Sequence, residues 1–184
     1  MSNGARHKRV FRELTGFTQN TDATIPQDWN ISLVNEDNIF EWKATSAGPD
    51  NTSYKHGIFE VNIKFGTEYP FKPPTVVFRS KMFHPNIASD GRICLDTLGT
   101  AWTPAMTVKV VLFSLMVLLQ EPNNETQYYK KLKGIEREKL IIESVWKNGN
   151  VNSKFEGEFE QKLIETGFKV NDKLKKVNDV YFFK

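Results

Sequence analysis

The sequence predicts an α+β fold: an N-terminal helix, a four-stranded antiparallel meander sheet, a central buried helix and C-terminal helices. Residues 57–65, in the first half of the chain, alternate between apolar and polar side chains with the period of a strand. An apolar run follows at residues 108–119, and residues 125–146 are helical in character. Helices that precede and follow a run of strands, rather than alternating with them, are typical of an antiparallel sheet.

The N-terminal helix is predicted from Val10, Leu14 and Phe17, which recur at helical spacing and can pack inward. The same stretch is strongly basic, and a basic helix face suits an acidic protein partner. An ordinary solvated helix face is the alternative. The basic residues are Arg6, His7, Lys8, Arg9 and Arg12.

Four strands are predicted after this helix, at residues 31–34, 39–44, 57–65 and 75–79. Three prolines in residues 69–74 (YPFKPP) fix an extended path before the last strand, because proline has no N–H to donate to a sheet. Phe71 therefore sits on a stiff loop. An exposed Phe71 is a candidate protein-docking point, and a core-facing side chain is the alternative.

The second half begins with a loop at residues 102–105 (WTPA) that leads into the apolar helix, and Pro122 ends that helix. The run at 108–119 is interrupted by Lys109 and Ser114 and is too short to cross a bilayer. We therefore expect a core helix and no membrane partner.

Composition indicates a globular protein with one domain and an appendage: 184 residues, 39% hydrophobic and 26% charged. A net charge of +3 is too small to indicate nucleic-acid binding. The first residues lack the apolar segment of a secretory signal, and the chain has one cysteine. Both observations predict a reducing compartment, the cytoplasm or the nucleus.

Cys94 is that single cysteine, so the chain cannot form an internal disulfide or a multi-thiolate zinc site. Cys94 is either a small apolar residue packed in the core or a nucleophile. Asn86 offers an amide donor for an oxyanion, and Asp96 offers a carboxylate two residues after the thiol. Residues 89–91 (SDG) predict a tight turn that brings these groups together, which favours the nucleophile.

Four motifs together resemble the ubiquitin-conjugating enzymes. They occur in the family's order and spacing, with Cys94 ten residues after His84, and the resemblance covers about residues 5–150. It implies the family's fold, a catalytic domain at residues 1–150, and an acyltransferase that forms a thioester. The motifs are YPFKPP at 69–74, HPNI at 84–87, GRICLD at 91–96 and WTPA at 102–105.

The resemblance implies a role for each residue of the site. Cys94 accepts ubiquitin from the activating enzyme as a thioester and passes it to a substrate lysine or a ligase cysteine. Asn86 stabilises the oxyanion or the loop beside it, Asp96 orients the incoming lysine, and His84 is structural rather than a base. No metal or organic cofactor is implied, because the activating enzyme consumes the ATP.

The resemblance also implies the partners of a monomer: ubiquitin, the activating enzyme, RING or HECT ligases and protein substrates. Lys8, Arg9 and Arg12 would meet the activating enzyme and ligases, and Phe71, Pro104 and Ala105 would lie on two loops that ligases grip. Three alternatives remain: a catalytically silent ubiquitin-binding scaffold, a carrier of another ubiquitin-like modifier, and a thiol hydrolase, which lacks a persuasive base.

Two positions depart from the family's pattern. Thr126 falls where an acidic or serine gate is usual, and Ile31 falls where some relatives carry a serine for a second, non-covalent ubiquitin. The spacing from Cys94 to Trp102 lacks the insertion of the SUMO-conjugating relatives, which favours ubiquitin as the modifier.

Residues 151–184 exceed the minimal catalytic domain and are predicted to form a helical extension docked on the core or on a partner. The alternative is a partial segment similar to a ubiquitin-associated domain, at residues 163–168. Thr166 replaces the methionine of that motif, and only sixteen residues follow Phe168, too few for two further helices.

Overall fold

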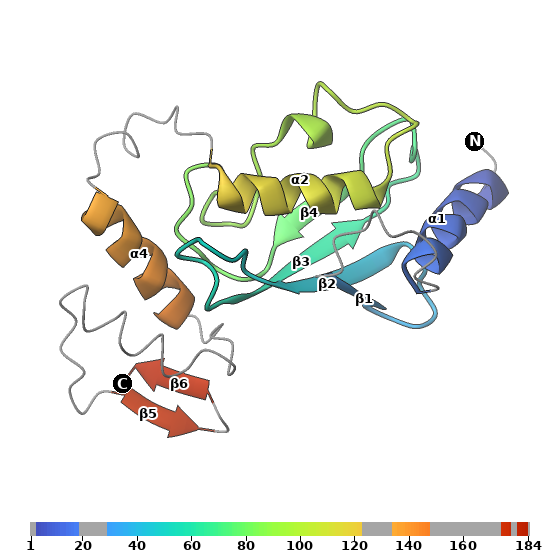
Figure 1. Cartoon of the computed structure of the whole chain (residues 1–184). Helices are drawn as coiled ribbons and strands as arrows, with labels where there is room; N and C mark the ends of the chain where they lie inside the picture. The colour runs from blue at the N-terminus through green and yellow to red at the C-terminus, as the bar shows by residue number, and fades with distance from the viewer. Residues whose placement is uncertain (1–2, 19–28, 123–133, 148–173, 178–179, 184) are drawn as a thin grey trace.

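A computed structural model describes residues 3–18, 29–122, 134–147, 174–177 and 180–183 of the chain. Its centre is a four-stranded antiparallel sheet in the order β1-β2-β3-β4, so each strand pairs with the next one in sequence (Figure 1). The predicted meander and the α+β class are confirmed. The strands are β1 Asn30–Leu33, β2 Glu41–Ala47, β3 Ile58–Lys64 and β4 Thr75–Phe78.

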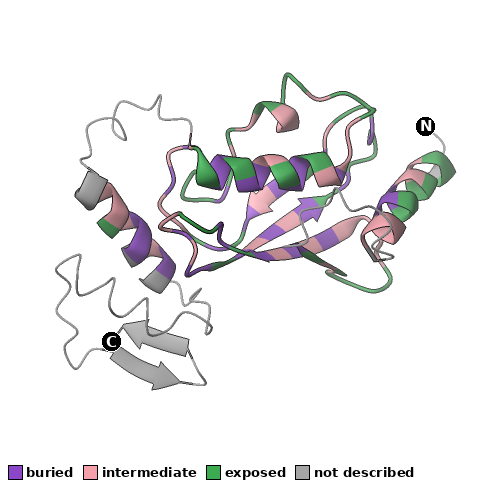
Figure 2. Cartoon of the chain, viewed as in Figure 1, coloured by how far each residue is buried: buried purple, intermediate pink, exposed green. Residues whose placement is uncertain are grey.

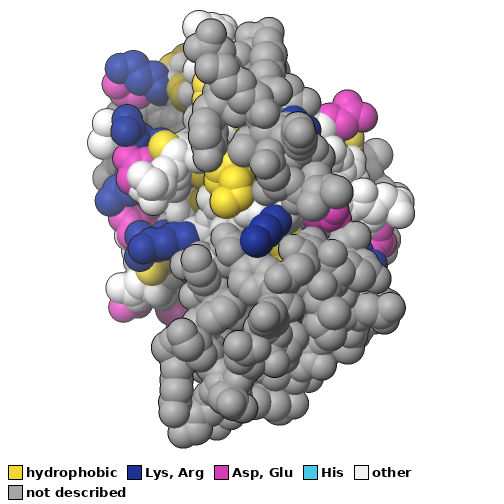
Figure 3. Space-filling view, turned by 90° about the vertical axis from the view of Figure 1, so that its left-hand side faces the viewer, with side chains coloured by type: hydrophobic (Ala, Val, Ile, Leu, Met, Phe, Trp, Pro, Cys, Tyr) yellow, Lys and Arg dark blue, Asp and Glu magenta, His cyan; other side chains and the backbone are white. Residues whose placement is uncertain are grey.

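The two faces of the sheet follow the alternation in the sequence. A row of inner residues crosses all four strands, because Leu33 is opposite Trp42, Trp42 is opposite Ile63, and Ile63 is opposite Val76. The outer face is polar and carries two cross-strand ion pairs, Lys64–Glu41 at 2.7 Å and Lys43–Glu60 at 3.7 Å. In Figure 3, basic and acidic side chains are interspersed along one edge of the molecule rather than gathered by sign.

The helix α2, Val108–Gln120, matches the predicted apolar helix to within one residue and has seven buried side chains. These buried side chains confirm the predicted core helix, but one face of it is exposed. Val110, Phe113 and Val117 are 41%, 56% and 38% exposed. Their spacing of three and four residues puts them on one helix face, while the buried side chains lie on another (Figure 2). None of the described helices is long and apolar enough to cross a membrane.

Two further helices lie at opposite ends of the sheet (Figure 1). In α1, Asn3–Thr18, Val10 is fully buried and Phe17 packs edge-to-face on Trp42, as the spacing predicted. In α4, Gly134–Lys147, Ser144 Oγ accepts a hydrogen bond from the Phe83 N–H at 2.8 Å. The helix α4 therefore holds the chain just before His84.

The C-terminal residues that the structure describes form a hairpin rather than helices. The strands β5, Leu174–Val177, and β6, Val180–Phe183, pair antiparallel, and β6 contacts α4. The predicted helical extension is thus wrong for these residues, whose β-branched and aromatic side chains favour a strand. The ubiquitin-associated-like segment at 163–168 and the gate position Thr126 lie outside the described residues.

Candidate active site

The segment that carries Cys94 is held in place by backbone pairing. Short antiparallel bridges join His84 to Ile87, Ile87 to Ile93, and Val77 of β4 to Arg92. The Cys94 N–H donates to the carbonyl oxygen of Asn86 at 2.8 Å. Residues 84–87 and 92–94 therefore lie side by side, as the predicted convergence of Asn86 and Cys94 requires.

The predicted turn between them is present and depends on Gly91. The Gly91 N–H donates to Ala88 O at 2.8 Å, and Gly91 has a φ of +84°. A Cβ at this position would lie 2.0 Å from the carbonyl oxygen of Phe78. Only glycine combines that backbone conformation with so close a neighbour, so Gly91 fixes how the cysteine segment meets β4.

Asp90 and Arg92 close the same turn on its exposed side. Asp90 Oδ1 accepts from the Arg92 N–H at 3.1 Å, and Asp90 Oδ2 accepts from Arg92 Nε at 2.6 Å. The backbone hydrogen bond first, and then the guanidinium, lower the pKa of Asp90. Asp90 is therefore an ionised turn residue rather than an acid catalyst.

His84 is buried, and both of its ring nitrogens are engaged. Nδ1 accepts from the Asn86 N–H at 3.0 Å, so the proton lies on Nε2, which donates to Leu118 O of α2 at 3.0 Å. Burial lowers the pKa of His84 to about 4, although the Leu118 hydrogen bond opposes this shift. His84 is thus neutral near pH 7 and positions Asn86, in line with the structural role predicted for it.

We expect acid to destabilise the fold through His84. Its pKa is about 4 in the folded chain and 6.5 without burial, so below pH 6.5 the unfolded chain binds the proton first. The free energy of unfolding should fall as the pH drops from 6.5 to 4, by roughly 3 kcal/mol at most from this group. Denaturant titrations at several pH values measure this slope.

The variant His84→Gln should flatten that pH dependence, because it removes the group that titrates. His7→Gln is the matched control, since His7 is exposed and should leave the slope unchanged. A slope equally steep in His84→Gln and in the unmodified chain would contradict this origin of the acid sensitivity.

Cys94 and Asp96 reach solvent together. Both residues are exposed, while Leu95 between them is partly buried and extended, with φ −145° and ψ 124°. Side chains two residues apart in an extended segment emerge on the same side. Asp96 also begins the 3₁₀-helix η1, Asp96–Leu98, where its carbonyl oxygen accepts from the N–H groups of Gly99 and Ala101.

The arrangement suits acyl transfer to and from sulfur. An accessible thiol is flanked by an accessible carboxylate and lies against the main chain of Asn86, which is only 9% exposed. Among the described residues, no group of three His, Cys, Asp or Glu side chains is placed so that it could hold a metal ion.

The family model described as ubiquitin-conjugating enzyme matches residues 9–139, which include Asn86, Cys94 and Asp96. The chain belongs to the ubiquitin-conjugating enzyme family. One similar curated protein is the "Probable ubiquitin-conjugating enzyme E2 31" of Arabidopsis thaliana, which is 49% identical over 89 residues. That alignment covers 48% of this chain and 58% of the relative, so the chain spans less than two thirds of the relative's length.

In this member of the ubiquitin-conjugating enzyme family, most of the residues predicted to bind partners are accessible. Phe71 is 61% exposed, so of the two alternatives for its side chain the structure has the exposed one. Lys8 and Arg12 lie exposed on α1, and Pro104 and Ala105 lie exposed before α2.

Arg9 makes contacts within the fold that the sequence analysis did not predict. Its guanidinium donates to Glu13 Oε1 at 2.5 Å, to Pro104 O at 3.0 Å and to Met106 O at 2.6 Å. Burial alone would lower the pKa of Arg9, but the hydrogen bond and charge of Glu13 raise it. Arg9 therefore joins α1 to the loop before α2, and its role in partner binding stays a prediction.

The predictions omitted Glu13, which is buried beside Arg9. One signal was available, because Glu13 follows Arg9 by four residues and so shares its helix face. That face also carries Val10 and Leu14 toward the core, so a carboxylate there needed buried donors that the sequence alone does not locate.

Proposed function

We propose that this chain is a ubiquitin carrier: it accepts ubiquitin from an activating enzyme as a thioester on Cys94 and transfers it to a substrate lysine or a ligase cysteine. The observation that carries the proposal is the exposed, single thiol held against Asn86 with the carboxylate of Asp96 on the same side. Membership of the ubiquitin-conjugating family supports it.

Loading exchanges one thioester for another. The Cys94 sulfur attacks the carbonyl carbon of the ubiquitin C-terminus, a new C–S bond forms, and the thiolate of the activating enzyme leaves. In the second step a lysine amine attacks the same carbon, the bond to Cys94 breaks, and an isopeptide bond forms with loss of a proton from nitrogen. Positioning of the two reactants dominates both steps.

The chain needs no resident metal or organic cofactor in this proposal, because ATP is spent earlier, by the activating enzyme. A reducing compartment, the cytoplasm or the nucleus, suits a carrier whose only cysteine must stay a free thiol. The proposed partners of the monomer are ubiquitin, the activating enzyme, RING or HECT ligases and protein substrates.

A loading assay tests the proposal. The chain is incubated with activating enzyme, ATP and ubiquitin and separated on gels with and without reductant. We expect an adduct of one ubiquitin that reductant removes. An adduct with another ubiquitin-like modifier alone would overturn the choice of ubiquitin, and no adduct with any modifier would identify a silent scaffold.

Asp96 should matter more for transfer than for loading. A lysine amine has a pKa of roughly 10.4 and must lose a proton to react, so we assign to Asp96 the orientation of the amine and the acceptance of its proton, while desolvation of the amine favours its neutral form. We expect Asp96→Ala to slow discharge onto free lysine about tenfold, the scale of one lost charge-assisted hydrogen bond. Loading should stay within about twofold, because it involves no amine.

The control for this variant is Asp37→Ala, which removes the same charge from an exposed position between β1 and β2. Single-turnover discharge from purified thioester measures the rate. Equal slowing of loading and discharge in Asp96→Ala would refute the role assigned to Asp96.

A further inference from the structure

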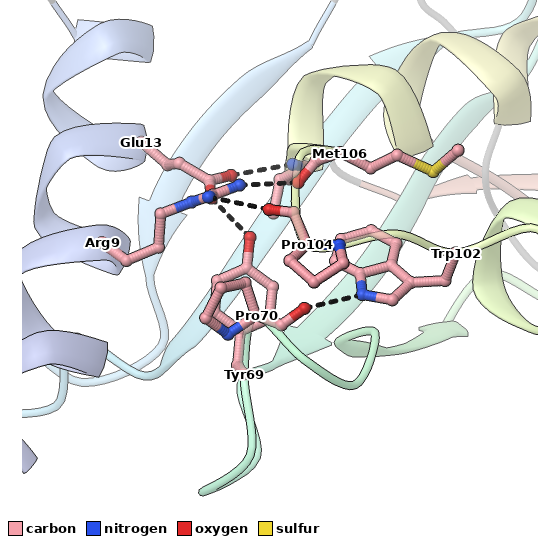
Figure 4. A network of polar contacts seen from close by, with 8 residues as sticks. Arg9, Glu13, Tyr69, Pro70, Trp102, Pro104 and Met106 are labelled. Atoms are coloured by element: carbon pink, nitrogen blue, oxygen red, sulfur yellow. Dashed lines mark hydrogen bonds and ion pairs between the residues drawn. The ribbon is translucent and has the colours of Figure 1, made fainter. Parts of the chain in front are cut away.

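One buried carboxylate connects three separate segments of the chain (Figure 4). Glu13 of α1 accepts from the Tyr69 hydroxyl and from Arg9 Nε through Oε1, and from the Val108 N–H through Oε2 at 2.8 Å. Its side chain is only 6% exposed. Tyr69 belongs to the loop between β3 and β4, and Val108 is the first residue of α2.

These contacts hold the two exposed loops. Arg9 adds hydrogen bonds to Pro104 O and Met106 O, and Trp102 Nε1 donates to Pro70 O at 2.8 Å. Phe71 follows Pro70 directly, and Ala105 lies between Pro104 and Met106. The positions of Phe71 and of Pro104–Ala105 therefore depend on one network, whose centre is Glu13 (Figure 4).

The donor pattern requires a carboxylate. Burial first, and then the charge of Glu13, raise the pKa of Tyr69, so its hydroxyl stays protonated and can donate. Arg9 and the Val108 N–H can only donate, and each faces a different oxygen of Glu13. A glutamine of the same shape would turn its NH₂ group toward one of these donors in either orientation. The site therefore requires the negative charge of the Glu13 carboxylate, and a neutral side chain of the same size would not satisfy these donors.

The network lies next to a surface cavity, and its hydrogen bonds do not extend to the segment that carries the Cys94 thiol. A cavity of about 370 Å³ lies between α1 and the start of α2, and its lining includes Arg12, Ala105 and Lys109. Glu13 also lines it. The hydrogen bonds of Arg9, Glu13 and Tyr69 involve none of residues 84–98, where Cys94 lies.

We propose that Glu13 is a positioning residue for a composite docking surface, which consists of Lys8, Arg12, Phe71, Pro104 and Ala105. Its carboxylate sets the spacing of α1 and the two loops, so that partners meet all three as one rigid surface. This inference rests on the proposed function, because the partners are the activating enzyme and the ligases. Glu13 acts through the docking residues and leaves the chemistry at Cys94 unchanged.

The test compares Glu13→Gln with Glu68→Gln, a control that removes an exposed carboxylate paired with Lys72 in the loop before β4. We expect Glu13→Gln to raise the KM of the activating enzyme for this chain about tenfold, as for one lost charge-assisted hydrogen bond, with kcat unchanged. Discharge of purified thioester onto free lysine should also be unchanged. Glu68→Gln should alter none of the three.

Hydrogen exchange gives a readout that does not depend on activity. In Glu13→Gln, the amides of residues 66–72 and 103–108 should exchange faster together, while those of residues 84–96 keep their rates. Tyr69→Phe removes one hydrogen-bond donor to Glu13 and should accelerate exchange of the same amides to a smaller degree. This variant replaces Glu13→Gln in the experiment if Glu13→Gln does not fold.

Three outcomes separate the hypotheses. Unchanged KM and exchange in Glu13→Gln and Tyr69→Phe would overturn the positioning role. An equal fall of kcat and lysine discharge would overturn it too, since the effect would then reach Cys94. An unmodified chain that cannot be loaded would refute the proposed function instead, and the exchange rates would still decide whether Glu13 fixes the loops.

Discussion

Replacing Cys94 with serine is expected to abolish the reductant-sensitive ubiquitin adduct completely. Cys94 is the only cysteine in the chain, so the variant has no thiol that could form a thioester. A serine hydroxyl is a much weaker nucleophile than a thiolate and needs an adjacent base to attack. His84 cannot be that base, because both of its ring nitrogens are already hydrogen-bonded. The variant should therefore form either no adduct or a slowly made ester that reductant does not cleave.

We expect Cys94→Ser to fold normally, so a missing adduct would result from the lost thiol and not from unfolding. Cys94 is exposed, and the contacts that hold its segment are backbone bridges and the hydrogen bond from its own N–H to Asn86 O, all of which serine retains. Cys94→Ala serves as the second variant and should form no adduct of either kind. Thermal unfolding of all three proteins should coincide within a few degrees, as for surface substitutions. A reducible adduct in Cys94→Ser at the yield of the unmodified chain would place the carrier site elsewhere.

The sheet and α2 were predictable because their sequence signals are local and strong. In β3 the side chains alternate between buried Phe59, Val61 and Ile63 and more exposed neighbours, which is the period that predicts a strand. The apolar run that predicts α2 ends within one residue of the helix itself. Burial of alternate or continuous apolar residues is the dominant favourable term in folding, so these patterns specify the fold closely.

The contacts of Arg9 were not predictable in the same way. Its partners Pro104 and Met106 lie more than ninety residues away in sequence, and both accept through backbone carbonyl groups, which every residue possesses. No residue type or spacing marks such a contact. For the same reason a basic side chain on α1 looked like a surface charge, although the fold uses it internally.

The exposed stripe of α2 and the C-terminal hairpin escaped prediction for a different reason. Apolar composition indicates that Phe113 can be buried, not that another element exists to cover it. At residues 174–183, short alternating and apolar stretches fit a strand as well as a helix, and only pairing decides between them.

Motif spacing identified the residues of the site but not how they meet. Asn86 and Cys94 come together because Ile87 pairs with Ile93 and because Gly91 adopts a φ that other residues avoid. The role of His84 also needed the structure, since a cysteine with a histidine nearby suggests a base until both ring nitrogens are located. The backbone pairing of Ile87 with Ile93 therefore determines how the reactive side chains are arranged in the site.

Replacing Asn86 with alanine is expected to slow transfer to lysine by about 10²–10³, the cost of losing one oxyanion donor. Attack by an amine places negative charge on the carbonyl oxygen of the thioester, and an amide N–H is a suitable donor for it. The backbone contacts of Asn86, to His84 Nδ1 and to the Cys94 N–H, persist in the variant. Loading should fall much less, because its nucleophile is a thiolate, which attacks a thioester more readily than an amine does, so the exchange needs less stabilisation of its oxyanion.

The isosteric variant Asn86→Asp separates the donor from the shape of the residue. It keeps the volume of a side chain that is only 9% exposed but offers no N–H when ionised, so transfer should be at least as slow as in Asn86→Ala. Asn62→Ala, on the outer face of β3, is the matched control and should transfer at the unmodified rate. Rates are measured from purified thioester with free lysine. If Asn86→Asp instead transfers at nearly the unmodified rate while Asn86→Ala does not, the side chain acts by filling space in the loop, and the oxyanion role assigned to it is wrong.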